Sequence, residues 1–264
     1  MDIITATAPD DPTLPFDGPR GFSTSGLAGL YFMDGTDTTA AIANAAGGAA
    51  TAVVPAAGQA WAAAALMTNG GINLKGNTYL PGPTIDLTTE WTMFAHLAVG
   101  LPTQHDGVTT WLSPILSTNQ YGANKGVILY SSVSAGYPSA ANAISPNHRW
   151  FNSGAQAAAV SLGAPSDVTY TQCYTFATSF KSGNLRSRIF RAGSKVAEVV
   201  SAVTIANIVN GVPSQKPTVG TPLQNYAEAN LMCEVCGTYT RELSDNDLAT
   251  ADLMSIAVRQ GRGR

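Results

Sequence analysis

The sequence predicts an all-β protein, a two-sheet antiparallel sandwich with a short C-terminal helix and an irregular N-terminal arm. Short runs with a side-chain period of two recur along the chain, separated by turn residues such as Gly, Asn and Asp. After residue 170 these runs follow one another at roughly the 8–12-residue spacing that is typical of sandwiches. The one strong helix signal lies near the C-terminus, where it starts at Ser244.

We expect residues 1–27 to form an extended N-terminal arm and residues 28–264 to form one β-sandwich domain. The arm is rich in Pro, Asp, Gly and Ser, which disfavour regular structure. Such an arm is either disordered or held on a neighbouring subunit. A chain of 264 residues is long enough to bury one sizeable core.

In the first half of the chain, four strands are expected: 29–33, 91–99, 114–117 and 126–133. The longest of them carries one set of residues on a single face: Trp91, Met93, Ala95, Leu97 and Val99. Residues 38–70 are rich in Ala and Gly and leave two interpretations open. They form either a short helix around 60–68 or loops that pack on the core.

Consecutive hairpins are expected after residue 170, with strands at 170–177, 185–190 and 196–200. A turn that contains Gly separates each strand from the next. A final strand runs through Leu231 to Cys236. Because side chains alternate along a strand, this prediction places Cys233 and Cys236 on opposite faces.

The final strand leads into a helix with a well-marked start. Ser244 is the expected N-cap, and Asp247 three residues later makes a variant of the capping box. Leu243 and Leu248 occupy the positions of a hydrophobic staple. Acidic residues in the first turn and Arg259 near the end favour the helix dipole.

The low charge of the chain bears on its partners. Charged residues make up 12 % of the sequence, against roughly 25 % in an average soluble domain. A formal net charge of −3 argues against a nucleic-acid partner, which needs a clustered basic surface. Neutral faces suit burial against other copies or other subunits, so we expect a homo-oligomer, for example a trimer. The alternative is a protein that relies on Ser, Thr and Asn for solubility.

The sequence also predicts a chain that is made in the cytoplasm and does not insert into a membrane. Its start has no basic region followed by an apolar core, as a secretion signal would. Residues 38–74 carry no charge, but their longest apolar run, 60–67, has eight residues, against about 20 needed to span a bilayer.

The three cysteines, Cys173, Cys233 and Cys236, do not resemble a disulfide framework. A redox C-x-x-C motif lies at a helix N-terminus, and a zinc site needs further ligands at suitable spacing. Neither condition is met, so we expect inert thiols that are buried or half-buried.

Several segments are similar to strands of one known superfamily: Gly29 to Asp34, Glu90 to Ala98, Ser113 to Thr118, Gly126 to Tyr130, Tyr174 to Glu198, and Thr240-Arg-Glu-Leu-Ser-Asp-Asn-Asp-Leu248. They resemble the laminin-G-like branch of the concanavalin A-like lectin/glucanase superfamily, and the last segment resembles its closing N-R-A-L-S-D-A-E-I motif. The resemblance covers residues 28–258 and implies a jelly-roll topology. Residues 134–165 fit no pattern of that superfamily.

No catalytic motif is found in the sequence. The glucanases of this superfamily carry closely spaced acidic residues on one strand, as glycoside hydrolysis requires. Here the glutamates are scattered, and only Glu90 has another acid, Asp86, four residues away. Nucleophile elbows, Walker loops and zinc-protease motifs are absent as well. We therefore expect that the chain is not an enzyme, against the alternative of a glycan hydrolase or lyase of the same fold.

Calcium is the one candidate cofactor. Many laminin-G-like domains bind calcium, and the resemblance makes Asp34 and Asp37 candidate ligands because hard cations prefer carboxylate oxygens. The alternative is that these residues close a turn after the first strand.

The best candidate for a ligand-binding surface is residues 145–154, interpreted as a loop bounded by Pro and Gly. It brings two aromatic residues together with polar donors: His148, Arg149, Trp150, Phe151 and Asn152. Such a mixture suits a sugar or a protein interface. Tyr121 is a second candidate. The alternative is that Trp150 starts a strand and packs in the core.

These observations favour a structural or adhesion module. An arm, unpaired cysteines, neutral faces and the missing secretion signal together suggest a virion component of a bacteriophage, such as a decoration, tail-tip or fibre protein. Such a module would mediate assembly, through the arm, or recognition of a host surface. The alternative is a lectin domain that binds cell-surface glycan.

Overall fold

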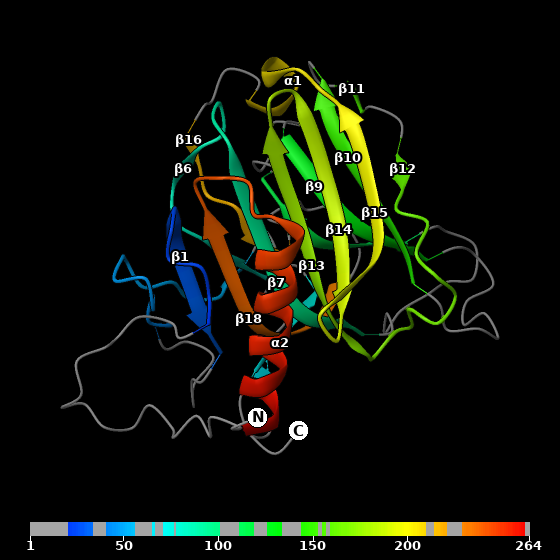
Figure 1. Ribbon diagram of the computed structural model, residues 1–264. Coiled ribbons are helices and arrows are strands. Elements are labelled where there is room, and N and C mark those ends of the chain that lie inside the picture. Colours follow the sequence, from blue (N-terminus) through cyan, green and yellow to red (C-terminus); the bar gives the residue numbers. More distant parts are fainter. Residues whose placement is uncertain are drawn as a thin grey trace.

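Two antiparallel sheets face each other in the computed structural model of this chain, and a C-terminal helix covers the outer face of one of them (Figure 1). The structure describes residues 21–33, 41–55, 65–66, 71–76, 78–100, 111–118, 126–133, 144–152, 155–156, 159–209, 214–220 and 229–261. The all-β sandwich and the C-terminal helix predicted from the sequence are confirmed.

The first sheet has eight strands. Its order is β15 (Ser194–Ala202), β14 (Asn184–Arg191), β13 (Cys173–Lys181), β7 (Trp91–Val99), β18 (Ala229–Tyr239), β4 (Ile72–Gly76) and β3 (Ala65–Leu66), with β1 (Leu27–Phe32) paired to β18. Strands from both ends of the sequence therefore meet in the middle of this sheet.

The second sheet also has eight strands. Its order is β11 (Ala155–Gln156), β10 (Ser145–Asn152), β9 (Gly126–Val133), β8 (Trp111–Ser117), β17 (Thr218–Val219), β5 (Thr78–Pro81) and β2 (Val54–Pro55), with β12 (Val160–Ser161) paired to β10. A separate two-stranded sheet joins β6 (Ile85–Asp86) to β16 (Ser214–Gln215).

Strand β7 shows how the sequence pattern produces the layers. All nine of its residues are buried. Its odd-numbered side chains, from Trp91 to Val99, join the core between the two sheets, which we call the inner core. Its even-numbered side chains include Phe94, which belongs to a second cluster on the other face of the sheet. The period-2 prediction for this strand is confirmed, and both faces are buried because both are covered.

The second cluster, which we call the outer core, lies between the first sheet and helix α2 (Asp245–Gly261). Leu248 and Ala251 of the helix pack there with Phe94 and Tyr239 of the sheet. Phe22 joins them, so the described end of the expected arm, residues 21–27, is packed on the domain. The other helix, α1 (Ile205–Val209), contacts β9 and β10.

The start of α2 follows the capping prediction. The amide of Asp247 donates to Ser244 Oγ at 3.1 Å, and the amide of Ser244 donates to Asp247 Oδ2 at 3.1 Å. Leu243 and Leu248 are both buried in the outer core, as a staple requires. The reciprocal bonds satisfy donors that would otherwise be unpaired at the helix end.

Two tight turns join β13, β14 and β15. Lys181 pairs with Asn184 and Arg191 with Ser194, so each loop has two residues. All four loop residues have positive φ, including Ser182 at 49° and Ala192 at 50°. That conformation matches the strand twist of a hairpin. At Gly193 a Cβ would meet Leu253 of α2 at 3.0 Å, so this turn also needs a small residue.

Strand β18 departs from the predicted alternation. Cys233 lies opposite Leu97 and Val235 lies opposite His96, so Glu234 is an extra residue in a β-bulge. On its other edge, β18 pairs with β4 before the bulge and with β1 after it. It puts Cys233 and Cys236 on the same face, in the inner core, and the prediction that they face opposite sides is wrong.

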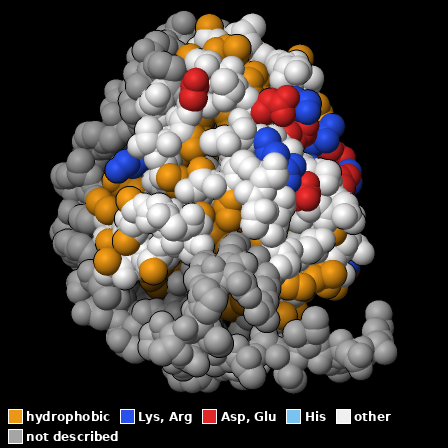
Figure 2. All heavy atoms as spheres, turned by 60° about the vertical axis from the view of Figure 1, so that its left-hand side comes forward, with side chains coloured by type: hydrophobic (Ala, Val, Ile, Leu, Met, Phe, Trp, Pro, Cys, Tyr) orange, Lys and Arg blue, Asp and Glu red, His pale blue; other side chains and the backbone are white. Residues whose placement is uncertain are grey.

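The charged side chains are unevenly distributed over the surface. Figure 2 shows most of the Lys, Arg, Asp and Glu side chains of the viewed face gathered at one side, with isolated charged side chains elsewhere. No helix within the described ranges is long and apolar enough to cross a bilayer.

Candidate functional site

Residues 145–152, which the sequence suggested as part of a loop, form strand β10. The strand pairs with β9 from Ser145 opposite Ser132 to Phe151 opposite Gly126. The loop prediction is therefore wrong for these residues, because the segment continues the second sheet in register. Alternation along β10 separates the candidate residues into two groups, with His148 and Trp150 on one face and Asn147 and Arg149 on the other.

His148 is fully buried and bridges the two sheets. Its Nε2 lies 2.8 Å from Ser201 Oγ of β15, and its Nδ1 lies 3.2 Å from Ser187 Oγ of β14. Thr178 Oγ1 is 3.0 Å from Ser187 Oγ and extends the network into β13. Burial lowers the pKa of His148 from 6.5 to about 4, so the ring is neutral at pH 7.

Trp150 lies beside His148, with ring centroids 5.8 Å apart and an edge-to-face arrangement. It is partly buried and packs against the inner core. The structure therefore favours the alternative in which Trp150 is a packing residue. The side chains of Trp150 and His148 both lie on the face of β10 that points to the opposite sheet.

Arg149 lies on the outer face of the second sheet, above the ring of Tyr130. The guanidinium carbon is 5.3 Å from the ring centroid, a cation–π arrangement. Burial raises the pKa of Tyr130, and Arg149 acts in the opposite direction. Asn147 lies two residues away on the same face, where its amide donates to Ser132 Oγ at 3.2 Å. Ile128 and Tyr130 of β9 are buried on this face, whereas Asn147 and Arg149 of β10 are partly exposed.

The other predicted site residues are not tested by the structure. Phe151 and Asn152 lie in β10, where only their backbone is described. Tyr121 and the calcium candidates Asp34 and Asp37 lie outside the described residues. Within the part of the chain that is described, no group of three or more His, Cys, Asp or Glu side chains is placed to hold a metal ion.

A second buried polar cluster joins β7 to α2. His96 Nδ1 lies 3.0 Å from Thr175 Oγ1 and 3.4 Å from Asp252 Oδ1. Thr175 donates to the same carboxylate oxygen at 2.7 Å, and the amide of Gly193 donates to the other at 2.8 Å. His96 and Asp252 are 1 % and 0 % exposed. The cluster fixes the helix on the sheet through a charge-assisted contact.

Opposed effects set the charges in this cluster. Burial alone would lower the pKa of His96, but hydrogen bonding to Asp252 and the nearby Cys173 raise it overall. Burial alone would raise the pKa of Asp252, but hydrogen bonds from His96, Gly193 and Thr175 lower it overall. This pair was not predicted from the sequence. The signal available there was a polar residue, Asp252, on the buried stripe of the helix, which also contains Leu248, Ala251 and Ser255.

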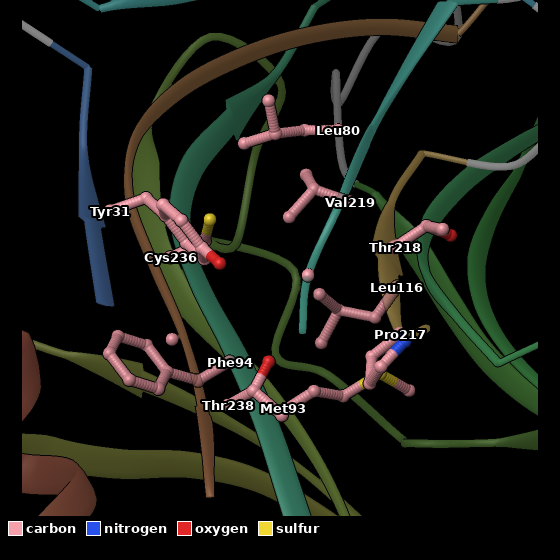
Figure 3. A pocket seen from close by; sticks show the side chains of 12 residues that line it. Tyr31, Leu80, Met93, Phe94, Leu116, Pro217, Thr218, Val219, Cys236 and Thr238 are labelled. Carbon is pink, nitrogen blue, oxygen red and sulfur yellow. The ribbon is translucent and has the colours of Figure 1, made fainter. Parts of the chain in front are cut away.

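A small apolar cleft opens between the two sheets (Figure 3). It encloses about 250 Å³, open solvent included, and is lined by Tyr31, Leu116, Val219 and Cys236 among others. Even with open solvent included, this volume is below the roughly 300–1,000 Å³ of typical small-molecule pockets. The cleft is therefore no sugar site, although it gives Cys236 a route toward solvent.

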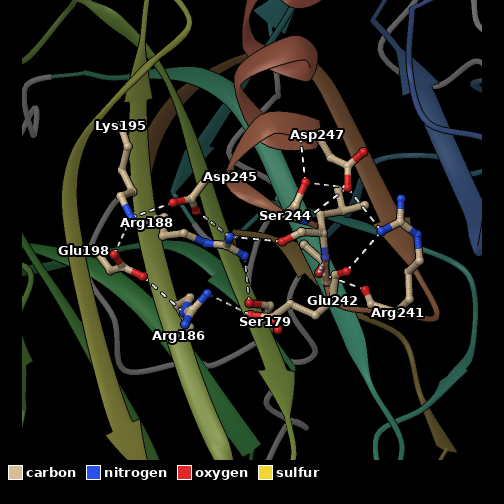
Figure 4. A network of polar contacts seen from close by, with 12 residues as sticks. Ser179, Arg186, Arg188, Lys195, Glu198, Arg241, Glu242, Ser244, Asp245 and Asp247 are labelled. Atoms are coloured by element: carbon tan, nitrogen blue, oxygen red, sulfur yellow. Dashed lines mark hydrogen bonds and ion pairs between the residues drawn. The ribbon is translucent and has the colours of Figure 1, made fainter.

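A network of charged residues surrounds the start of α2 (Figure 4). Arg188, fully buried, donates to the carbonyl oxygen of Leu243, to Asp245 Oδ1 and to Ser179 Oγ, at 2.9–3.0 Å. Burial lowers the pKa of Arg188, while Asp245 opposes that effect. Further ion pairs join neighbouring side chains: Lys195 with Asp245, Lys195 with Glu198, Arg186 with Glu198 and Glu242, and Arg241 with Asp247. These contacts are internal, and they hold the helix start on β14 and β15.

Comparisons with protein-family models and with curated protein sequences find no match. Solved structures do share the fold. Trypanosoma rangeli sialidase in complex with sialic acid is similar with a TM-score of 0.57 at 12 % identity, over 88 % of this chain and 33 % of that chain. The binding domain of botulinum neurotoxin serotype D/C VPI 5993 is similar with a TM-score of 0.52 at 10 % identity, over 89 % of this chain and 52 % of that chain.

A structure of botulinum neurotoxin type C, whose cell entry depends upon interaction with two ganglioside molecules, is similar with a TM-score of 0.52 at 10 % identity, over 88 % of this chain and 50 % of that chain. The chain thus spans about a third of the sialidase and about half of the toxin structures. At these identities the similarity shows a shared β-sandwich fold.

These similarities correct one expectation. The missing motifs predicted that the chain is not an enzyme, but the sandwich that it adopts also occurs within sialidases, which are enzymes. Catalytic side chains are assembled from strands and loops that are distant in sequence, so the lack of a local motif does not exclude them. The prediction therefore fails.

Proposed function

We propose that this chain is a glycan-binding β-sandwich module that takes acidic glycans, such as those carrying sialic acid. The observation that carries the proposal is the shared fold. Over 85–90 % of its length the chain resembles solved structures, among them a sialidase bound to sialic acid and a toxin whose cell entry depends on gangliosides. Membership of the concanavalin A-like superfamily, which the sequence suggested, belongs to the same proposal.

The outer face of β10 is the binding surface that we assign to this module, because Asn147 and Arg149 are partly exposed there. We expect the guanidinium of Arg149 to exchange its present contacts for two parallel hydrogen bonds to a carboxylate. Its position above Tyr130 pre-orients it. Asn147 adds its amide oxygen as an acceptor for a sugar hydroxyl, while its amide nitrogen donates to Ser132 and Ser145. Trp150 and His148, the residues first suspected, face the other sheet and support this surface from behind.

A glycan array with matched sialylated and non-sialylated glycans tests the function, and titration with the best ligand tests the site. We expect Arg149→Ala to weaken binding about tenfold or more, since hydrogen bonds to charged groups contribute roughly 1.5–3 kcal/mol. Arg191→Ala is the matched control, because Arg191 lies on the first sheet and pairs with Asp167. An array without any bound glycan would refute the function. Equal affinities of the two variants would refute the site.

A second candidate function is assembly into a larger particle, as a decoration, tail-tip or fibre protein of a phage virion. It is favoured by the charge distribution, because one side of the face in Figure 2 carries most of the charge and leaves broad neutral areas. Deleting residues 1–20 keeps Phe22 in the outer core and tests the arm. We expect light scattering to show an oligomer that the deletion weakens. A monomer before and after deletion would contradict this candidate.

A further inference from the structure

The β-bulge at Glu234 creates a feature that ordinary strand alternation would prevent. Cys233 and Cys236 lie opposite Leu97 and Ala95, two residues that share one face of β7. The two cysteines therefore occupy neighbouring positions on one face of β18. Neighbouring same-face positions on a strand are roughly 6.6 Å apart, within the range of roughly 4.4–6.8 Å between the Cα atoms of disulfide-bonded residues.

The two thiols also influence each other. The interaction with the Cys236 side chain is the largest of the effects that raise the pKa of Cys233, ahead of burial. Both cysteines are free, and Cys233 is fully buried while Cys236 is 6 % exposed. The pair is thus preassembled in the inner core, with its two members in different surroundings.

The difference lies in the apolar cleft, because Cys236 lines it and Cys233 does not. In Figure 3 the sulfur of Cys236 lies beside the ring of Tyr31, facing the cleft. The cleft leaves room for about one water-sized molecule. A small neutral oxidant can therefore reach Cys236, while a peptide-sized disulfide such as oxidised glutathione is excluded by size.

We propose that Cys233 and Cys236 form a peroxide-oxidisable dithiol site, in which Cys236 reacts first and Cys233 resolves. The Cys236 sulfur attacks one oxygen of hydrogen peroxide and the O–O bond breaks. The thiol proton leaves with the departing hydroxide as one water, and a sulfenic acid remains on Cys236. The Cys233 sulfur then attacks the Cys236 sulfur, the S–OH bond breaks, and the thiol proton leaves with the hydroxide as a second water. Two thiols are oxidised to one disulfide, and one peroxide is reduced to two waters.

The test is peroxide treatment of the folded chain, then denaturation and alkylation with iodoacetamide. The chain has three cysteines. We expect the peptide that carries residues 233–236 to lose two hydrogens and both alkylation sites. In the Cys173→Ser variant, which keeps the pair, we expect no alkylated cysteine at all. If Cys233 and Cys236 stay alkylatable after peroxide while Cys173 is oxidised, the proposal is overturned.

Two further experiments test whether the oxidant reaches Cys236 through the cleft. Oxidised glutathione should leave the pair reduced in the folded chain, and oxidation as fast as with peroxide would overturn access through the cleft.

Leu116→Ala enlarges the cleft and should speed peroxide oxidation severalfold. Leu185→Ala removes an equally buried leucine that does not line the cleft, and it is the matched control. Equal rates in the two variants would assign the oxidation to general loosening of the core and would overturn the proposed route.

Discussion

At the scale of single residues, His148 gives the fold a dependence on pH. The ring is neutral and hydrogen-bonded to Ser187 and Ser201, and burial lowers its pKa from 6.5 to about 4. Between these two pH values the unfolded chain binds a proton at this position and the folded chain does not. Stability therefore decreases as the pH falls through this window, and it is fully present above pH 6.5.

We expect the free energy of unfolding to fall by about 3 kcal/mol at most between pH 6.5 and pH 4 through His148. Denaturant titrations at several pH values measure it. Asp252 and Asp245, whose pKa values are lowered, make the free energy of unfolding depend on pH below pH 3.8. His96, whose pKa is raised, makes it depend on pH above pH 6.5. In His148→Gln the slope within the window should disappear. A slope that persists there would assign it to another group.

Ala192 is a residue-scale weakness of the β14–β15 turn. It has a φ of 50°, a conformation that costs an L-residue with a Cβ roughly 1–2 kcal/mol. Asn tolerates this conformation better and is favoured in two-residue hairpin loops. We expect Ala192→Asn to raise the free energy of unfolding by about 0.5–1 kcal/mol in denaturant titrations. Ala202→Asn, at the end of strand β15, should bring no gain, and a gain of equal size there would contradict the explanation.

At the scale of elements, the N-terminus of α2 depends on Ser244. Its hydroxyl accepts from the Asp247 amide at 3.1 Å, and the cap is exposed to solvent, so its loss leaves no cavity. We expect Ser244→Ala to lower the free energy of unfolding by about 1 kcal/mol. Thr250→Ala is the control, since Thr250 is a partly exposed residue within the helix and Ala is a better helix former. If both variants lost the same amount, the cap would have no special role.

The elements also show what the sequence could predict. The capping box and the two-residue turns were foreseeable because their geometry depends on residues within four positions of each other. The bulge at Glu234 was not foreseeable, because it depends on which strands pair with β18 on either edge, and those come from the other end of the chain. Strand β10 was misjudged for a related reason. Its Pro and Asn residues favour a loop, and pairing with β9 overrides them.

At the scale of the whole molecule, one strand belongs to both cores. Trp91 and Leu97 of β7 pack in the inner core, while Phe94 of the same strand packs in the outer core. Loss of either core would expose a face of β7, so the two should unfold together. We expect a single transition in which fluorescence, which follows the tryptophans, and far-UV circular dichroism, which follows α2, coincide. Loss of the helix signal at lower denaturant concentration would show that the outer core unfolds separately.

The candidate site lies beyond local prediction for a similar reason. The sequence drew attention to residues 145–154, but only the sheet decides which side chains of a strand face outward. His148 and Trp150 face inward, so the surface falls to Arg149 and Asn147. The contacts of His96 with Asp252 and of His148 with Ser201 span long stretches of sequence. No spacing rule connects such residues before the sheets are assembled.

The pairing of β18 with β1 and β7 sets the order in which the chain can fold during synthesis. Roughly 130 residues separate the end of β7 from the start of β18, which corresponds to on the order of ten seconds of translation. Until then the centre of the first sheet is an open edge, and its outer face lacks the helix. A nascent chain that ends before Tyr239 is therefore no smaller domain. Its open sheet edge is a template for aggregation until the last strand arrives.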